Sequence, residues 1–162
     1  AFDALEGGYG GVMDAQGNLW SSPNGMANSG VVWLRPPPLL PPTTNDWQVL
    51  FTGAASPYGI AVDPLHSYIW QTSEDSVFRW HTDGTPVTNA WGTVILHPHG
   101  GRQGERAKGL AVDGRGHVWV AHGDSATTVG HLDTNGTHLG NIQMELTGLR
   151  APLKSLLRPD KG

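Results

Sequence analysis

The sequence predicts an all-β protein, a β-propeller of four-stranded antiparallel blades with about three blades in this chain. The first observation is composition: 162 residues include 23 glycines and 12 prolines, while only 15% of the residues are charged. Turns must therefore be frequent, which excludes a helical bundle or a coiled coil. The second observation is an internal repeat of about 50 residues, which is the length of one propeller blade.

Three landmarks recur along the chain in the same order. Each repeat has a glycine, then an aspartate four residues later, then a tryptophan, and equivalent landmarks are separated by 49 or 50 residues. The landmarks are Gly10, Gly59 and Gly109; Asp14, Asp63 and Asp113; and Trp20, Trp70 and Trp119. A spacing shared by three landmarks makes chance a poor explanation.

Each unit reads as four strands joined by hairpins. The first strand ends at the aspartate, whose side chain can bond backbone amides two residues on, while a following glycine accepts positive φ. The second strand resumes before the tryptophan and runs through it. The predicted third strands are 30–34, 76–80 and 127–132, and the predicted fourth strands are 46–51, 90–96 and 138–144.

Three units give three blades, at about residues 8–56, 57–106 and 107–150, with 151–162 as a tail or the lead-in to a next blade. A proline-rich insertion at 35–44 predicts an extended loop outside the sheet. Propellers close with about 4 to 8 blades. Open sheet edges are an aggregation hazard, so we expect a second chain or further blades to complete the ring.

The repeated pattern Gly-x-Ala-Val-Asp, followed by a turn and a tryptophan, is present at 59–70 and 109–119. It resembles NHL-type propellers and the superfamily that includes streptogramin (virginiamycin B) lyase and the gluconolactonase-like enzymes. The resemblance covers nearly the whole chain and is specific for the architecture rather than the activity. It implies a divalent cation, Mg²⁺ or Ca²⁺, held near the mouth of the propeller by a histidine and a glutamate, here His122 and Glu74.

The crossover His97–Arg106 gathers two imidazoles, two guanidiniums and a carboxylate in ten residues. The resemblance implies that such a crossover runs over the face that bears the central mouth. With the cation as a Lewis acid, His122 or His99 is expected to remove a proton or activate water. The expected ligand-binding residues are His97, Arg102, Glu105 and Arg106, with the arginines holding a carboxylate or an oxyanion. The alternative is that this segment is only a polar connection.

The repeated residues themselves have a structural explanation. Three aspartates at one repeat position are expected to cap hairpins, and they lie one blade apart, too far to share a catalytic proton. The repeated tryptophans are expected to pack between blades, and Trp33 and Trp80 are interpreted as equivalent strand residues. Only Trp47 and Trp91 are expected to offer an exposed surface for stacking on a ligand.

Three functions stay open at this stage. A binding or scaffold module that recognises a protein or glycan through its mouth loops is favoured, because no complete catalytic set is visible in three blades. The alternatives are a metal-assisted lyase or lactonase and a structural, self-assembling module.

Net charge and hydropathy limit the classes of partner that we expect this chain to bind. The formal net charge is −4 with scattered lysines and arginines, which argues against nucleic acid. No apolar run approaches the ~20 residues that a membrane-spanning helix needs. Without cysteine there is no disulfide framework or thiol chemistry. A start at Ala1 without an initiator methionine suits a processed product or an internal fragment, and we expect a protein that is secreted, periplasmic or part of the cell envelope.

Overall fold

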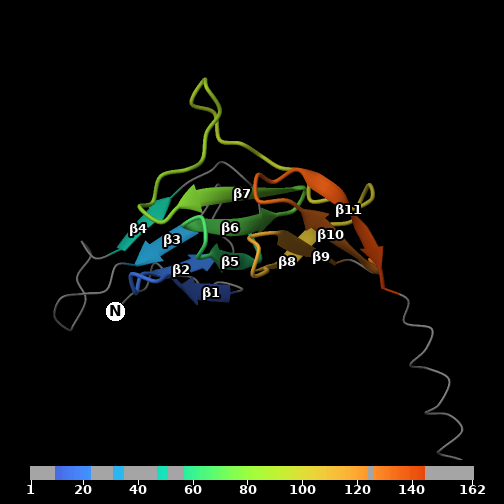
Figure 1. Ribbon diagram of the computed structural model, residues 1–162, viewed down its shortest axis with the longest axis horizontal. Helices are drawn as coiled ribbons and strands as arrows, with labels where there is room; N and C mark the ends of the chain where they lie inside the picture. The colour runs from blue at the N-terminus through green and yellow to red at the C-terminus, as the bar shows by residue number, and fades with distance from the viewer. Residues whose placement is uncertain (1–9, 23–30, 35–46, 51–56, 124–125, 145–162) are drawn as a thin grey trace, which may run out of the picture.

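The computed structural model describes residues 10–22, 31–34, 47–50, 57–123 and 126–144. These residues form eleven β-strands in three antiparallel sheets, and no helix occurs among them. The sheets fan out side by side, and their first strands, β1, β5 and β8, follow one another along one edge (Figure 1). This arrangement is a partial β-propeller, in which each sheet is one blade and the first strands are innermost.

The first and third blades each contain four strands in sequential order. In the first blade the strands are β1 (Gly10–Met13), β2 (Leu19–Ser22), β3 (Val31–Leu34) and β4 (Trp47–Leu50). In the third blade they are β8 (Ala107–Val112), β9 (Val118–His122), β10 (Thr128–Leu132) and β11 (His138–Gln143). The repeat therefore predicted both sheets correctly.

The second blade has only three regular strands, β5 (Ile60–Asp63), β6 (Tyr68–Ser73) and β7 (Ser76–His81). The predicted fourth strand at 90–96 is wrong. Asn89 starts a turn there: its side-chain oxygen accepts hydrogen bonds from the amides of Trp91 (2.9 Å) and Thr93 (3.0 Å), and Gly92 adopts φ 75°. This is the same turn chemistry as in the aspartate hairpins, with asparagine in place of aspartate.

As a result, the outer edge of β7 is covered at two separate points. Val77 pairs with His97, Trp80 pairs with Pro86, and a hairpin closed by the Thr88–Val94 bridge lies between them in the sequence. The hairpin projects from the sheet (Figure 1), and the side chain of Trp91 near its tip is 89% exposed. Trp91 is exposed, as expected for a stacking surface, although not on a strand.

The repeated aspartates organise the first hairpin of each blade. Asp14 accepts a hydrogen bond from the indole Nε1 of Trp20 (2.8 Å), and Asp113 accepts one from Trp119 (3.1 Å). Each aspartate lies six residues before its tryptophan. In the second blade the separation is seven residues, and Asp63 bonds His66 Nδ1 (2.7 Å) instead.

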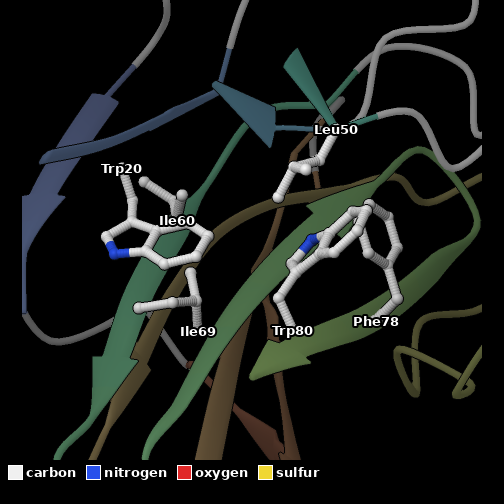
Figure 2. Close-up of a cluster of buried hydrophobic side chains, with 6 residues drawn as sticks. All are labelled: Trp20, Leu50, Ile60, Ile69, Phe78 and Trp80. Carbon is white, nitrogen blue, oxygen red and sulfur yellow. The ribbon is translucent and has the colours of Figure 1, made fainter. Parts of the chain in front are cut away.

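Two apolar cores lie between consecutive blades. Figure 2 shows the first core, where Trp20 of the first blade lies between Ile60 and Ile69 of the second. In the second core, Trp70 contacts the third blade. The first core consists of Trp20, Leu50, Ile60, Ile69, Phe78 and Trp80, and the second of Trp70, Val77, Ala107, Val118, Val120 and Leu132. The repeated tryptophans 20 and 70 therefore stabilise contacts between blades rather than within them.

The strand register corrects one sequence alignment. Trp33 pairs with Trp20, whereas Trp80 pairs with Ile69, the residue before Trp70. The interpretation of Trp33 and Trp80 as equivalent is therefore wrong by one position. In a strand, a shift of one position changes the face on which a side chain lies. Trp47 belongs to β4, and its side chain lies outside the described part of the structure.

Glycine at position 59 is required by the close approach of two inner strands. A β-carbon at Gly59 would lie 2.6 Å from the carbonyl oxygen of Lys108, at the start of β8. The hydroxyl of Thr72 links the same strands, because it accepts a hydrogen bond from the amide of Gly59 (2.7 Å) and donates one to the carbonyl of Lys108 (2.9 Å). Inner strands therefore meet backbone to backbone here.

Candidate functional site

The crossover from the second to the third blade is fastened between the ends of β6 and β9. The amide of Ala107 donates to the carbonyl of Glu74 (2.9 Å), and the amide of Gly123 donates to the carbonyl of Arg106 (2.9 Å). These two bonds bring the crossover and the two loops that follow the second strands to one face of the molecule. Most residues of the predicted site therefore share that face.

His122, at the end of β9, is buried and uses both ring nitrogens in hydrogen bonds. Its Nε2 donates to the backbone carbonyl of His99 (3.0 Å). Its Nδ1 lies 2.9 Å from the hydroxyl and 3.1 Å from the carbonyl of Thr128, the first residue of β10. Neither nitrogen is left to coordinate a cation unless one of these bonds breaks.

Thr128 connects His122 to a carboxylate. Its hydroxyl donates to Oε2 of Glu105 (3.0 Å), and this oxygen lies 4.0 Å from Nδ1 of His122. Glu105 also accepts the amide of Arg102 (2.9 Å). That backbone bond, followed by the Thr128 bond and the His122 ring, lowers the pKa of Glu105, so the carboxylate is ionised at neutral pH. Sequence reasoning did not single out Thr128.

His99 lies against His122, with ring centroids 5.1 Å apart and ring planes at 70°. The side chain is only 8% exposed, and its Nδ1 accepts a hydrogen bond from the amide of Gly101 (3.1 Å). Burial, reinforced by the nearby His122, lowers the pKa of His99 against the opposing effect of Asp75 and Glu105. His99 is therefore neutral at physiological pH, with its proton on Nε2, where it can donate but not accept.

Glycine at position 130 allows this arrangement. A β-carbon at Gly130 would lie 2.2 Å from the carbonyl oxygen of His99. The crossover therefore packs directly on the backbone of β10. A glycine inside a predicted strand is a signal for such a close approach, and it was the available sequence clue to this site.

The remaining predicted residues lie apart from this cluster. Glu74 forms an ion pair with Arg106 (Oε1 to Nη1, 2.7 Å) at the surface. The side chain of Arg102 is exposed. His97 is buried beside the second core, with its ring centroid 5.6 Å from that of Trp70. Burial, with a contribution from Arg79, lowers the pKa of His97 to about 4.

The structure thus joins His99, His122 and Glu105 through Thr128, and separates Glu74 and His97 from them. In the part of the chain that the structure describes, no three His, Asp or Glu side chains are arranged to hold a metal ion. The predicted metal ligands Glu74 and His122 are each engaged by protein partners, Arg106 in one case and Thr128 and His99 in the other. Their role in binding a cation stays a prediction.

One further pair of side chains lies at the start of the inner strands, outside the predicted set. The ammonium of Lys108 sits 3.5 Å from the ring centroid of Tyr58, within the range of a cation–π interaction. Both residues immediately precede a landmark glycine, so they are equivalent positions of the repeat. This pair places a positive charge near the inner edge of the blades.

Comparison with known proteins finds likeness at the level of structure alone. No family model matches the chain, and no curated protein matches it. Streptogramin B lyase superposes with a TM-score of 0.62 at 16% identity, over 85% of this chain and 40% of the lyase. Regucalcin from Agrobacterium tumefaciens, described as calcium-binding, gives 0.56 at 19% identity, over 83% and 44% of the two chains.

A gluconolactonase from Xanthomonas campestris gives a TM-score of 0.53 at 20% identity, over 83% of this chain and 46% of the enzyme. The chain therefore has the streptogramin lyase-like propeller fold, and it spans less than half the length of each of these three proteins. Within the described residues, no helix is long and apolar enough to cross a membrane.

Proposed function

We propose that this chain supplies about half of a propeller enzyme that opens a lactone ring. The observation that carries the proposal is the hydrogen bond that the amide of Gly101 donates to Nδ1 of buried His99, which leaves the ring proton on Nε2. In the hydrolysis, water adds to the carbonyl carbon, the ring C–O bond breaks, and the proton lost by the water ends on the oxygen that leaves the ring. Nε2 of His99 donates a hydrogen bond to the carbonyl oxygen and stabilises the negative charge that develops on it. The likeness to lactonases and a lyase supports this function over the binding module favoured by sequence.

The neighbours of His99 have positioning roles in this proposal. His122 fixes the crossover by donating to the carbonyl of His99, and Thr128 and Glu105 fix the ring of His122 in turn. Arg102, whose side chain is exposed on the crossover, is the group available to hold a substrate carboxylate or hydroxyl. No proton transfer to the neutral His99 is included, because its acceptor nitrogen is already used by Gly101.

A divalent cation, Mg²⁺ or Ca²⁺, does not fit the described residues as they are placed. Its predicted ligands are Glu74 and His122, and both side chains form hydrogen bonds with other protein groups. If the completed ring binds a cation, the additional donors must come from elsewhere, so no step of this proposal passes through it. Export to the cell envelope or beyond likewise stays a prediction.

The test measures lactone opening by the purified chain. With glucono-1,5-lactone as substrate, the reaction is monitored through the acid it releases. A streptogramin B is the second substrate, and its conversion to the linear product is measured. His99→Ala is expected to lower kcat by about 100-fold or more, the loss seen when one oxyanion donor is removed. His66→Ala, which changes a histidine in the hairpin at the opposite ends of the strands, is the matched control and should keep full activity. Turnover of either substrate that His99→Ala leaves unchanged would overturn the proposal.

A second candidate, recognition of a protein or glycan partner, is favoured by one observation. Trp91 is 89% exposed on a hairpin that projects from the second blade, where its indole is accessible for stacking on a partner. If this hairpin binds a partner, Trp91→Ala should abolish retention on a glycan or protein array, while Leu65→Ala, at a comparably exposed apolar residue, should not. Equal retention of the two variants would exclude this role for Trp91.

A further inference from the structure

Contacts between consecutive blades follow a rule based on the repeated tryptophan. Trp20 and Trp70 are both fully buried, and each packs on the blade that follows its own. The third blade has its own copy, Trp119, which is only partly buried. Instead of a following blade it meets His131 of its own blade, with stacked rings 4.0 Å apart. Among the described residues, Trp119 therefore holds the position of an interface residue with no following blade packed on it.

The face around Trp119 is apolar. Register places Ala111 and His131 beside Trp119 in one row, and Ala121, Val129 and Ile142 in the next. Ala111 and Ala121 are exposed, and Ile142 is 52% exposed. We name Ala111, Trp119, Ala121, Val129 and Ile142 the Trp119 face. The corresponding face of the second blade, around Trp70, is the one that packs on the third blade.

The other end of the array offers the complementary surface. The blade that receives a tryptophan does so with the residue just before its own tryptophan: Ile69 receives Trp20, and Val118 receives Trp70. The equivalent residue in the first blade is Leu19, which is 38% exposed. Met13 pairs with Leu19 and is 66% exposed, and Leu34 pairs with it on the other side. We name Met13, Leu19 and the register position of Leu34 the Leu19 face.

Aligned positions explain why these two faces match. Leu19–Leu34 is in register with Ile69–Trp80 and with Val118–Leu132, the pairs that receive a tryptophan inside the chain. All three pairs are apolar, and the two internal ones are buried. The Leu19 face thus matches a surface that receives a tryptophan twice inside the molecule, which indicates that it receives a tryptophan as well.

We propose that the Trp119 face docks on the Leu19 face of a second copy of this chain, and that the reciprocal contact closes a ring of two chains. Length supports the second copy as the occupant. One chain spans 40 to 47% of the lyase, regucalcin and lactonase propellers, so two chains supply about one complete ring. Two identical head-to-tail contacts then leave no blade face open.

The first test measures mass in solution by light scattering during size-exclusion chromatography. The 17.3 kDa chain should elute as a dimer of roughly 35 kDa. Trp119→Glu and Leu19→Glu should each raise the dimer Kd by on the order of 100-fold or more, because each buries a charge in the contact. Leu65→Glu, at an exposed apolar residue in a hairpin outside both faces, should stay dimeric.

A second test does not depend on how the glutamate variants fold. The chain has no cysteine, so Ala121→Cys and Leu19→Cys each introduce a single thiol, one on each face. A short bis-maleimide should join the two variants when they are mixed, and neither variant to itself. A folded wild-type monomer, open-ended oligomers, or cross-linking of Ala121→Cys to itself would overturn the proposal. These measurements need no substrate, so their outcome is separate from that of the lactonase assay.

Discussion

The second and third blades share one repeat but differ in how well their polar atoms are satisfied. Among the described side chains, four buried nitrogens lack a hydrogen-bond partner, and all four belong to the second unit. They are Trp70 Nε1, Arg79 Nε, Trp80 Nε1 and His97 Nε2. This unit is also the one with the longer first hairpin and the interrupted fourth strand. One extra residue in a hairpin, or one extra turn in a strand, thus changes the hydrogen bonds of the side chains around it.

The extra residue in the second hairpin has a direct effect on Trp70. In the third blade the six-residue separation lets Asp113 accept the indole proton of Trp119. In the second blade Asp63 bonds His66, and Trp70 is left with Arg79, whose guanidinium carbon lies 5.2 Å from the indole ring centroid. A cation–π contact thus stands where the other blades have a hydrogen bond.

The largest expected effect is a loss of stability in acid caused by His97. Its pKa is about 4 in the folded chain, because burial disfavours the charged ring, against an ordinary value of 6.5. Stability is therefore complete above pH 6.5 and falls as the pH drops toward 4, since only the unfolded chain takes up the proton. The free energy of unfolding should fall by on the order of 3 kcal/mol over this interval. Urea unfolding of wild type and His97→Gln at several pH values measures this difference, and equal pH slopes in the two proteins would contradict it.

The next effect compares two aspartates. Asp14 accepts four hydrogen bonds, from Gln16, from Trp20 and twice from Asn18. Burial raises its pKa, and these bonds outweigh burial and lower it. Asp14→Ala should cost about 2–3 kcal/mol in stability because buried donors lose their acceptor, and Asp63→Ala about 1 kcal/mol. Thermal unfolding monitored by circular dichroism distinguishes them; a larger loss for Asp63→Ala would show that the longer hairpin is the more strongly held.

A smaller effect isolates the indole hydrogen bond. Trp20 and Trp70 are both fully buried, but only Trp20 donates to an aspartate. Trp20→Phe should therefore destabilise the chain by about 1 kcal/mol more than Trp70→Phe, which removes an unpaired donor. The two unfolding free energies, measured in one denaturant, give the difference directly. Equal losses would mean that packing volume alone decides both substitutions.

The smallest effect concerns Ser67, the one described non-glycine residue with positive φ (57°). Ser67→Gly should stabilise the chain by about 0.5 kcal/mol, because relief of the left-handed conformation exceeds the added flexibility of the unfolded chain. Gly92→Ala is the converse control: Gly92 has φ 75° with open space around it, so its loss of about 1 kcal/mol reports backbone strain alone. A drop in melting temperature for Ser67→Gly would contradict this account.

The sequence was sufficient for the parts of the fold that depend on local chemistry. Aspartate followed by glycine specifies a hairpin over a few residues, so the blades could be located without a structure. The fourth strand of the second blade was missed because Asn89 and Gly92 form the same signal inside an apolar run. The Trp33 and Trp80 alignment failed because a one-residue shift leaves the composition of a strand unchanged while it exchanges the two faces.

Much of the candidate site could not be predicted from sequence. The pairing of Glu74 with Arg106 joins residues 32 positions apart, and the bond between Glu105 and Thr128 joins residues 23 apart. Their meeting depends on the path of the crossover over the strand ends, which no local pattern encodes. The number of charged and imidazole groups in the crossover was visible in advance, but their partners were not.

The backbone contact at Gly59 has a consequence for symmetry. The rotation from one blade to the next is limited by how closely inner strands approach, and here the approach is limited by main-chain atoms and the hydroxyl of Thr72. That rotation, repeated around the axis, determines how many blades complete a full circle. A larger side chain at position 59 would push two consecutive blades apart and increase the angle between them, which leaves a smaller angle for the remaining blades. One hydrogen atom in place of a side chain thus helps to set the count of blades in the closed molecule.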